Sequence, residues 1–352
     1  MKTTSLNQKK ETLVQLGNIF ESLVKDGNWP GYSIGLNENE YNDFKSLLPT
    51  LKNHNGWFSY DMIIIALNAW ANAFKMDNLS IWLNKYSIDN NSYAKKVAII
   101  CAGNIPMVGF HDIICGYISG HSLLIKLSSD DAILIPAVIE LMSKFDDNII
   151  NQISFVSTKL KDFNAVIATG SNNTSRYFND YFSKYPNIIR KSRTSVAVLN
   201  GEENDEQLVE LAKDVFTYYG LGCRNVTKLF LPAGYDLNKL FKAFFFMQDV
   251  INNNKYANNY DYHKAIFLLD KFEIIENGFL ILKEDKEIFS PIGTLYYEFY
   301  NQTEEVNKIL SHHENQIQCI VGLNGVPFGK AQEPFLWDYA DNIDTLNFLN
   351  KL

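Results

Sequence analysis

Cys223 is the residue of this chain best suited to covalent chemistry. It lies in the stretch 218–225 (Tyr-Tyr-Gly-Leu-Gly-Cys-Arg-Asn), between an amphipathic helix predicted at 207–216 and a strand predicted at 226–232. The two glycines allow a tight turn and a close approach of the backbone to a ligand. The neighbouring Arg224 favours the thiolate, which is the nucleophilic form. The stretch indicates a nucleophilic cysteine, and local pattern leaves a small buried cysteine as the alternative.

Three more turns follow predicted strands and could hold a ligand. The side-chain amide of Asn104 could donate to an oxygen near a helix N-terminus, or cap the following helix. Lys126 is at the end of the predicted strand 122–127, where open α/β sheets bind ligands, with a solvated lysine as the alternative. Gly170 and Ser171 form a strand-to-helix turn suited to a pyrophosphate, without the full G-x-G-x-x-G pattern.

A fifth candidate stretch, 287–293 (Glu-Ile-Phe-Ser-Pro-Ile-Gly), lies in the second half of the chain. Glu287 could bind a sugar hydroxyl or be an ordinary loop carboxylate. The six histidines form neither a His-Glu-x-x-His pair nor a Cys/His set, so we predict no metal. The chain also lacks the G-x-S-x-G pattern of a serine nucleophile.

Composition narrows the class of protein. Hydrophobic residues make up 46% and charged residues 20% of 352 residues, which is typical of a soluble globular protein. A net charge of −8 argues against a nucleic-acid partner. The four cysteines are widely spread and the first eleven residues are polar, so we expect reduced thiols and a cytoplasmic location. The longest strongly apolar run, 62–67, is too short for a transmembrane segment.

The elements that must position these residues form two α/β parts. Residues 1–93 read as mostly helical, packed on a sheet or on a partner subunit. Short apolar strands then alternate with helices, which indicates a parallel sheet of the kind that binds nucleotides. The strands are expected at 97–101, 122–127, 153–157, 165–168 and 195–199, and the helices at 108–118, 132–145 and 171–182.

Beyond Cys223 the strands continue and helices become fewer. Strands are expected at 226–231, 265–269, 279–282, 294–300 and 317–321, with helices at 237–251 and 304–312. We therefore expect a helical layer and nucleotide-binding domain at 1–215, a smaller catalytic domain at 216–330, and a tail at 331–352 that packs back on the body. The hinge is expected near 214–222, which would put Cys223 at a domain interface, where ligand sites are common.

Taken in order, these motifs resemble the aldehyde dehydrogenase superfamily, and more closely its acyl-CoA reductase (LuxC-type) branch. The resemblance rests on Asn104 before Pro106, then Lys126, Gly170-Ser171, Gly220-x-x-Cys223 and Glu287-Ile288-Phe289-x-Pro291. The stretches 190–196, 327–332 and 336–341 resemble that branch in particular. The resemblance implies an aldehyde-dehydrogenase-like fold, with a Rossmann-like parallel-sheet cofactor domain and a smaller α/β catalytic domain.

The resemblance also implies roles for the matching residues. Cys223 would be the nucleophile, and Asn104 with the backbone N–H of the cysteine would form the oxyanion hole. Lys126 would contact the adenosine ribose, Gly170 and Ser171 would lie near the pyrophosphate, and Glu287, with Phe289 in the same motif, would hold the nicotinamide ribose. The cofactor would be NADPH or NADH. We expect an acyl-CoA or another acyl thioester as substrate and a homo-oligomer as the assembled state.

Two departures from the superfamily pattern bear on the reaction. Acid-forming members carry Glu-Leu-Gly-Gly where this chain has 190–193 (Arg-Lys-Ser-Arg), so the base that activates water is missing and the acyl-enzyme should resist hydrolysis. The basic run could attract phosphates of CoA or NADPH, or be solvated. Leu221 replaces the usual Gln before the nucleophile. We expect an acyl-CoA reductase that forms an aldehyde; the alternatives are a cysteine acyltransferase or thioesterase without redox chemistry, or a catalytically silent acyl-binding subunit.

Overall fold

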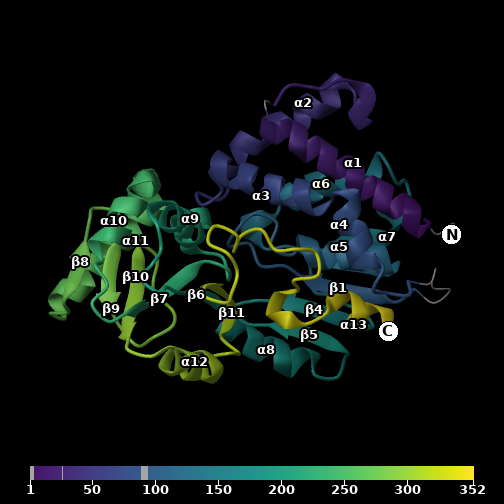
Figure 1. Ribbon diagram of the computed structural model, residues 1–352. Helices are drawn as coiled ribbons and strands as arrows, with labels where there is room; N and C mark the ends of the chain where they lie inside the picture. Colours follow the sequence, from purple (N-terminus) through teal and green to yellow (C-terminus); the bar gives the residue numbers. More distant parts are fainter. Residues whose placement is uncertain (1–3, 26, 89–93) are drawn as a thin grey trace. The chain divides into compact units, whose positions relative to one another are not determined.

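The computed structural model describes residues 4–25, 27–88 and 94–352 of the chain. The chain divides into two compact units: unit 1 comprises Met1–Lys191 and Phe335–Leu352, and unit 2 comprises Ser192–Pro334. Each unit is built on a sheet of its own, with helices packed against it (Figure 1).

Unit 1 begins with helices, because apolar residues recur at every third or fourth position. In α1 (Leu6–Lys25) this spacing buries Leu13, Leu16 and Phe20 on one face. The other elements of this part are η1 (Tyr32–Ile34), α2 (Glu38–Leu47), η2 (Leu48–Asn53), α3 (Tyr60–Ala73) and α4 (Met76–Leu83). They agree with the helical layer expected at 1–93, of which residues 1–3, 26 and 89–93 lie outside the described part.

The sheet of unit 1 is parallel throughout, in the order β3-β2-β1-β4-β5. Its strands are β1 (Lys96–Ile100), β2 (Ser122–Lys126), β3 (Ile153–Phe155), β4 (Ala165–Thr169) and β5 (Asn187–Arg190). The connecting helices are α5 (Phe110–Ser119), η3 (Ser129–Asp131), α6 (Leu134–Ser143), α7 (Ile149–Gln152) and α8 (Asn172–Phe182). The chain moves outward from β1 to β3, then returns to place β4 on the other side of β1. Strand order therefore reverses beside β1, the point where such sheets bind ligands at their carboxyl ends.

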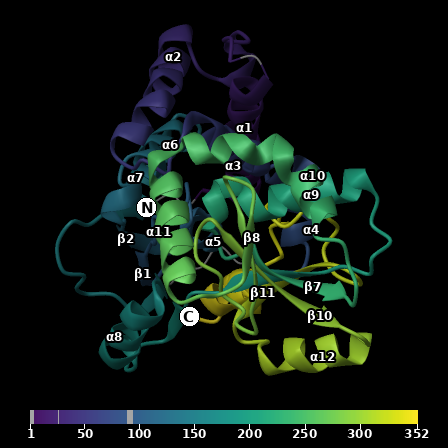
Figure 2. The ribbon, with the colours of Figure 1, turned by 90° about the vertical axis from the view of Figure 1, so that its left-hand side faces the viewer.

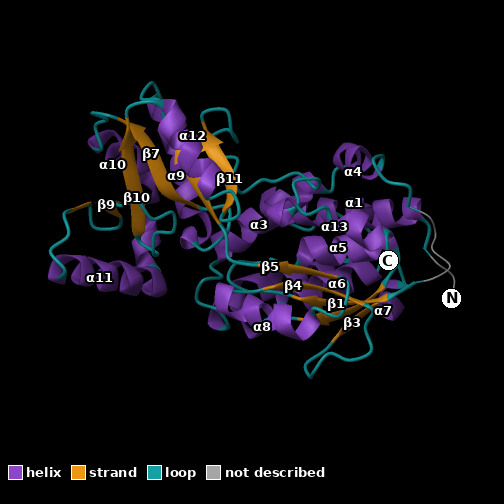
Figure 3. Ribbon diagram, turned by 90° about the horizontal axis from the view of Figure 1, so that it is seen from below, coloured by secondary structure: helices purple, strands orange, loops and turns teal. Residues whose placement is uncertain are grey.

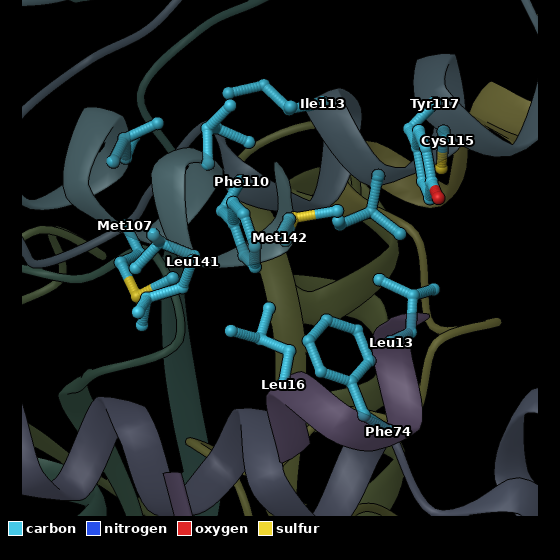
Figure 4. Packing of buried hydrophobic residues seen from close by; sticks show 14 of the residues in the cluster. Leu13, Leu16, Phe74, Met107, Phe110, Ile113, Cys115, Tyr117, Leu141 and Met142 are labelled. Carbon is cyan, nitrogen blue, oxygen red and sulfur yellow. The ribbon is translucent and has the colours of Figure 1, made fainter. Parts of the chain in front are cut away.

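Both faces of this sheet are covered, because successive side chains of a strand point to opposite sides. Val97 and Ile99 of β1 pack in a large core with residues of α1 and α5, whereas Ala98 packs with Phe182 of α8. Helices α5 and α8 accordingly lie on opposite faces of the sheet (Figure 3). Figure 4 shows part of the large core, in which Leu16 of α1 lies near side chains of the α5 and α6 region.

The C-terminal segment 335–352 packs on unit 1. The hydroxyl of Tyr339 accepts a hydrogen bond from Trp82 Nε1 at 2.7 Å and shares another with the Tyr86 hydroxyl at 2.8 Å. After η6 (Ala340–Asn342), α13 (Thr345–Asn350) buries Leu346 and Leu349 in the large core. The tail was expected to start at 331, and the compact unit includes it from 335.

The sheet of unit 2 has the order β11-β6-β7-β10-β9-β8 and is parallel except for the β8–β9 pair. The strands are β6 (Thr194–Val198), β7 (Val226–Pro232), β8 (Ile274–Glu276), β9 (Ile281–Glu284), β10 (Thr294–Tyr300) and β11 (Ile317–Gly322). The helices are α9 (Asp205–Phe216), η4 (Thr217–Gly220), α10 (Asn238–Phe244), η5 (Phe245–Asn252), α11 (Asn254–Leu269) and α12 (Thr303–His312). Helices α9 and α12 lie on opposite faces of this sheet (Figures 1 and 2).

Two expectations from the sequence differ from the structure. Residues 192–215 were expected in the first domain and lie in unit 2, because β6 pairs with β7 and β11 and α9 follows it. The strand expected at 265–269 is wrong: these residues are the end of α11, since a short apolar run does not distinguish a strand from a buried helix end. Strands β5 and β8 had not been expected.

Within the described residues, none of the helices combines the length and apolar character needed to cross a bilayer.

Candidate active site

Cys223 lies in a sharply turned loop between α9 and β7 of unit 2. After α9 ends at Phe216, three successive residues adopt positive φ: Tyr218 (54°), Tyr219 (58°) and Gly220 (81°). Left-handed backbone is costly for two tyrosines and persists only where the surroundings impose it; such strain often occurs at functional sites. Cys223 is exposed, although Gly222 before it and Asn225 two residues after it are buried.

Asn225 holds this loop in shape. Its side-chain Nδ2 donates to the carbonyl oxygens of Asp214 (3.1 Å), Val215 (3.2 Å) and Thr217 (2.7 Å), and its Oδ1 accepts from the Gly222 N–H at 2.7 Å. The last carbonyls of a helix have no partner within the helix, so this buried amide acts as a side-chain cap for α9. The same amide ties the helix end to the residue preceding Cys223.

The neighbouring strands fix the backbone on the other side of the nucleophile. The hydroxyl of Ser195, fully buried in β6, lies 3.0 Å from the carbonyl oxygen of Cys223 and 3.1 Å from the Sγ of Cys319 in β11. The Cys319 N–H donates to the same hydroxyl oxygen at 3.2 Å. Burial raises the pKa of the Cys319 thiol, which favours the less reactive protonated form of this second cysteine.

The loop with Glu287 and Phe289 reaches the start of β7, the strand that follows the Cys223 loop. The hydroxyl of Thr227 donates to the carbonyl oxygen of Ile288 at 2.8 Å, and Ile288 is buried between the exposed Glu287 and Phe289. The Glu287 N–H donates to Asp285 Oδ1 at 3.0 Å. Unit 2 thus brings the Cys223 loop and the Glu287 loop to the amino ends of its parallel strands.

Asn104 lies in unit 1, in the loop after β1, with its side chain exposed. The loop is held from two sides. Asn55 Nδ2 donates to the carbonyl oxygens of Gly103 (3.4 Å) and Asp130 (3.3 Å), and Asp131 Oδ2 accepts from the Met107 N–H at 2.8 Å. Met107 adopts a φ of 62°, which shows that this turn is also forced by its surroundings. Burial raises the pKa of Asp131 to about 6.

Lys126, Gly170 and Ser171 lie in the same unit as Asn104. Lys126 is the half-buried last residue of β2, paired with Ile100 of β1. Gly170 and Ser171 follow β4, and the exposed Ser171 is the N-cap of α8, its Oγ accepting from the Thr174 N–H at 3.2 Å. Because β2, β1 and β4 are adjacent and parallel, the four residues follow strands that end at one edge of the sheet, beside the reversal of strand order.

The structure therefore places the predicted residues in two groups. Asn104, Lys126, Gly170 and Ser171 belong to unit 1, and Cys223, Glu287 and Phe289 belong to unit 2. The sequence reasoning missed the supporting residues Asn55, Asp131, Ser195 and Asn225. Of these, Asn225 had a visible signal, since an Asn two residues past the cysteine and directly before a strand is suited to capping.

The prediction for the basic run 190–193 needs correction at Arg190. Its guanidinium is 4% exposed, forms an ion pair with Asp112 and donates from Nη2 to the Thr345 hydroxyl at 2.8 Å. Arg190 is therefore neither a solvated cation nor available to a phosphate. Arg193 donates to the backbone carbonyls of Glu314 (3.2 Å) and Ile317 (3.1 Å), and Lys191 is exposed.

A cavity of about 1020 Å³ in unit 2 lies away from these residues, between 200–210 at the start of α9 and 322–328 after β11. It opens at the carboxyl ends of β6 and β11, whereas the Cys223 loop lies at the amino ends of the strands. None of the predicted site residues lines it, so we do not assign it to the active site. Among the described residues, no group of three or more His, Cys, Asp or Glu side chains could hold a metal ion.

The fold is similar to that of solved aldehyde dehydrogenases. The indole-3-acetaldehyde dehydrogenase AldA of P. syringae, in complex with NAD⁺, matches with a TM-score of 0.60 and 11% identity, covering 90% of this chain and 72% of that one. A Mycobacterium tuberculosis aldehyde dehydrogenase complexed with NAD⁺ matches with a TM-score of 0.57 and 14% identity, and the match covers 89% of this chain and 72% of that one. Substrate-bound AldH of Staphylococcus aureus matches with a TM-score of 0.54 and 16% identity, and the match covers 88% of this chain and 74% of that one. Likeness at such low identity shows the fold alone, and it confirms the predicted aldehyde-dehydrogenase-like fold.

A family model matches part of the sequence. Residues 74–240, just under half of the chain, match the family described as acyl-CoA reductase (LuxC), in agreement with the resemblance of the motifs. The matched stretch includes Asn104, Lys126 and Cys223 and ends before Glu287. Among curated protein sequences, none matches the chain at a significant level.

Proposed function

We propose that the protein reduces an acyl thioester, a fatty acyl-CoA in the first instance, to the aldehyde with NADPH or NADH. The observation that carries the proposal is an exposed cysteine in a strained and fully supported turn, within the residues that match the LuxC family. An ordinary structural cysteine would be buried, as Cys101 and Cys115 are in this chain.

The first half of the proposed reaction uses this chain's own residues. The Cys223 thiolate attacks the thioester carbonyl carbon, forming a new sulfur–carbon bond. The bond from that carbon to the CoA sulfur then breaks, and CoA leaves as a thiolate that takes up a proton. The Asn104 amide and a backbone N–H are assigned to the oxyanion, where one donor contributes about 3–4 kcal/mol. The result is an acyl-cysteine at Cys223.

The residues of unit 1 fit a dinucleotide by their chemistry. The amino end of α8 offers backbone N–H groups and the exposed Ser171 hydroxyl to a diphosphate, and Lys126 stands on a neighbouring strand end. Glu287 is assigned to the nicotinamide ribose, next to Phe289. When bound, the reduced nicotinamide would supply a hydride to the carbonyl carbon of the acyl-cysteine; the bond from that carbon to the Cys223 sulfur then breaks, which releases the aldehyde and regenerates the Cys223 thiolate. Two of the solved aldehyde dehydrogenases named above carry NAD⁺, which supports this class of cofactor.

The acyl-enzyme is expected to persist until hydride arrives. Acid-forming relatives carry a carboxylate base at the position that matches Arg190, and an arginine stays protonated in proteins. In addition, Arg190 is buried and ion-paired with Asp112. A protonated guanidinium that is buried in an ion pair cannot act as the base that activates water.

The decisive experiment is to incubate the protein with acyl-CoAs of several chain lengths and NADPH or NADH, and to measure aldehyde and the decay of nicotinamide absorbance. The proposal requires both signals, with none from Cys223→Ala. Release of CoA thiol without nicotinamide decay would favour an acyltransferase or thioesterase. Binding of acyl-CoA without thiol release would favour a silent acyl-binding subunit.

A chase experiment tests persistence of the intermediate. Acyl-enzyme formed from labelled acyl-CoA is freed of excess substrate and followed with and without reduced nicotinamide. The label should leave slowly on its own and rapidly, as aldehyde, after the cofactor is added. Rapid release as free fatty acid without cofactor would contradict the reductase assignment and indicate a thioesterase.

A further inference from the structure

The stretch 327–332 (Pro-Phe-Gly-Lys-Ala-Gln) has no role in the proposed reaction, yet it is fastened to the loop of the nucleophile. Its Gly329 and Ala331 N–H groups donate to the two carboxylate oxygens of Asp214 at 2.7 and 3.0 Å. The Arg224 guanidinium, next to Cys223, donates to the Ala331 carbonyl oxygen at 3.4 Å. All of these residues belong to unit 2.

Burial of the Asp214 carboxylate is energetically unfavourable, so packing alone does not explain this residue. It is fully buried in the last turn of α9, where the helix dipole disfavours a negative charge. Glu210 and Glu333 add further negative charge nearby, while the two backbone N–H groups oppose these effects. Burial nevertheless raises the pKa of this carboxyl to about 6. The two N–H groups contact different oxygens of the carboxylate, and an Asn in this place would present an oxygen to one of them and an NH₂ group to the other.

Asp214 also leads directly to the cysteine loop. Its backbone carbonyl accepts from Asn225 Nδ2 at 3.1 Å, and the same Asn225 side chain accepts from the N–H of Gly222. One residue therefore joins three parts: the end of α9, the turn that precedes Cys223, and the stretch 327–332.

We propose that Asp214 is a positioning residue for the nucleophile, its carboxylate clamping the stretch 327–332 to the loop that presents Cys223. The assignment of Cys223 as the nucleophile rests on the proposed function. Loss of the clamp should leave the stretch 327–332 unanchored at Gly329 or Ala331 and allow the Cys223 turn to relax.

The test compares Asp214→Asn with the wild type and with Asp146→Asn. Asp146 is a matched control because it is also buried and both of its carboxylate oxygens accept hydrogen bonds, from the Thr4 and Tyr117 hydroxyls and from the Asn148 N–H, but it lies in unit 1. We expect Asp214→Asn to lower the rate of Cys223 alkylation by iodoacetamide, and kcat, by about tenfold, with KM for the nucleotide unchanged. Asp146→Asn should alkylate at the wild-type rate. Wild-type alkylation in folded Asp214→Asn would overturn the proposal.

A measurement on the unmodified protein keeps the proposal testable if Asp214→Asn does not fold. Protonation of Asp214 removes one acceptor, so hydrogen exchange of the 327–333 peptide, corrected for intrinsic rates, should lose protection as pH falls through about 6. The charged groups acting on Asp214 or on its neighbour Cys319 are Glu210, Glu333 and Arg224. Protection that does not change between pH 5 and 7 would overturn the clamp.

The two assignments fail in different ways. Alkylation requires neither acyl-CoA nor nicotinamide, so a reduced rate in Asp214→Asn supports the clamp even in a protein that makes no aldehyde. Such a protein would contradict the proposed function alone.

Discussion

At the scale of single residues, the four cysteines differ in their surroundings. Cys101 and Cys115 are buried, and burial raises the pKa of both thiols. Cys319 is partly exposed and its pKa is also raised by burial, which opposes formation of the thiolate. Cys223 is the exposed cysteine of the four. This difference makes the choice of nucleophile testable by chemistry.

Cys223→Ala should abolish the acyl-enzyme and leave nucleotide binding intact, because the substitution removes the sulfur and no predicted cofactor contact. Mass spectrometry of protein treated with acyl-CoA measures the first effect, and fluorescence titration with NADPH or NADH measures the second. Cys319→Ala is the matched control and should still acylate at position 223. A label on Cys101, Cys115 or Cys319 in the wild type would refute the assignment.

Lys126 and Glu287 are expected to affect different steps. Lys126→Ala should mainly weaken nucleotide binding, and Glu287→Ala should mainly slow hydride transfer, measured as a single-turnover rate at saturating cofactor. Lys161→Ala, at an exposed lysine of unit 1, controls for loss of one positive charge. Unchanged nucleotide affinity in Lys126→Ala would remove that residue from the site.

At the scale of secondary-structure elements, the site depends on how helices and strands end. The capping box of Asn204 and Gln207 satisfies N–H groups where α9 begins, and the side chain of Asn225 satisfies carbonyls where it ends. The second cap comes from a residue beyond the helix, so the end of α9 and the Cys223 turn form together.

Asn225→Ala should lower the free energy of unfolding by about 3 kcal/mol, because it leaves buried carbonyls of α9 and the Gly222 N–H without partners. Asn204→Ala, at the other end of the same helix, should cost about 1 kcal/mol as an N-cap loss. Urea denaturation of both variants gives the comparison. Equal costs would mean that Asn225 is no more than an ordinary cap.

Asp131, the last residue of the short helix η3, should make the stability of the protein depend on pH. The pKa of this carboxyl is raised in the folded state to about 6, above its ordinary 3.8, so its contribution to stability is complete below about pH 4 and is lost as pH rises through 6. The free energy of unfolding of Asp131→Asn, relative to that of the wild type, should therefore increase by up to about 2 kcal/mol as the pH rises from 4 to 7, in addition to a difference that does not depend on pH. Denaturation curves across this range test it, and a pH-independent difference would contradict it.

At the scale of the whole molecule, the chain leaves unit 1 after residue 191 and returns to it at 335. The return is secured by a buried ionic contact of Arg190, the last residue of β5, with Asp112 of α5 and with Thr345 at the start of α13. Arg190 therefore stabilises the fold of unit 1.

Asp112→Asn should destabilise unit 1 by about 3–5 kcal/mol, because it leaves the Arg190 charge buried without its partner. The surface pair of Lys242 and Asp205, each 77% exposed, provides the control, and Lys242→Ala should change stability by less than about 1 kcal/mol. Thermal unfolding of both variants is the measurement. Similar small effects would show that the buried pair is dispensable.

The sequence by itself predicted most of the elements, the α/β class and the aldehyde-dehydrogenase-like fold, and it supplied the candidate residues as hypotheses. These depend on local properties: helical and strand periodicity, glycine turns, and motifs in a fixed order. The tertiary structure decided which strands pair, and so moved 192–215 into unit 2. It also showed that Arg190 is buried and that Asn225, Ser195 and Asp214 surround the nucleophile's loop. Such contacts join residues up to more than one hundred positions apart, as between Asp214 and Ala331. A local pattern does not encode them, because packing decides which polar groups must find a partner inside the protein.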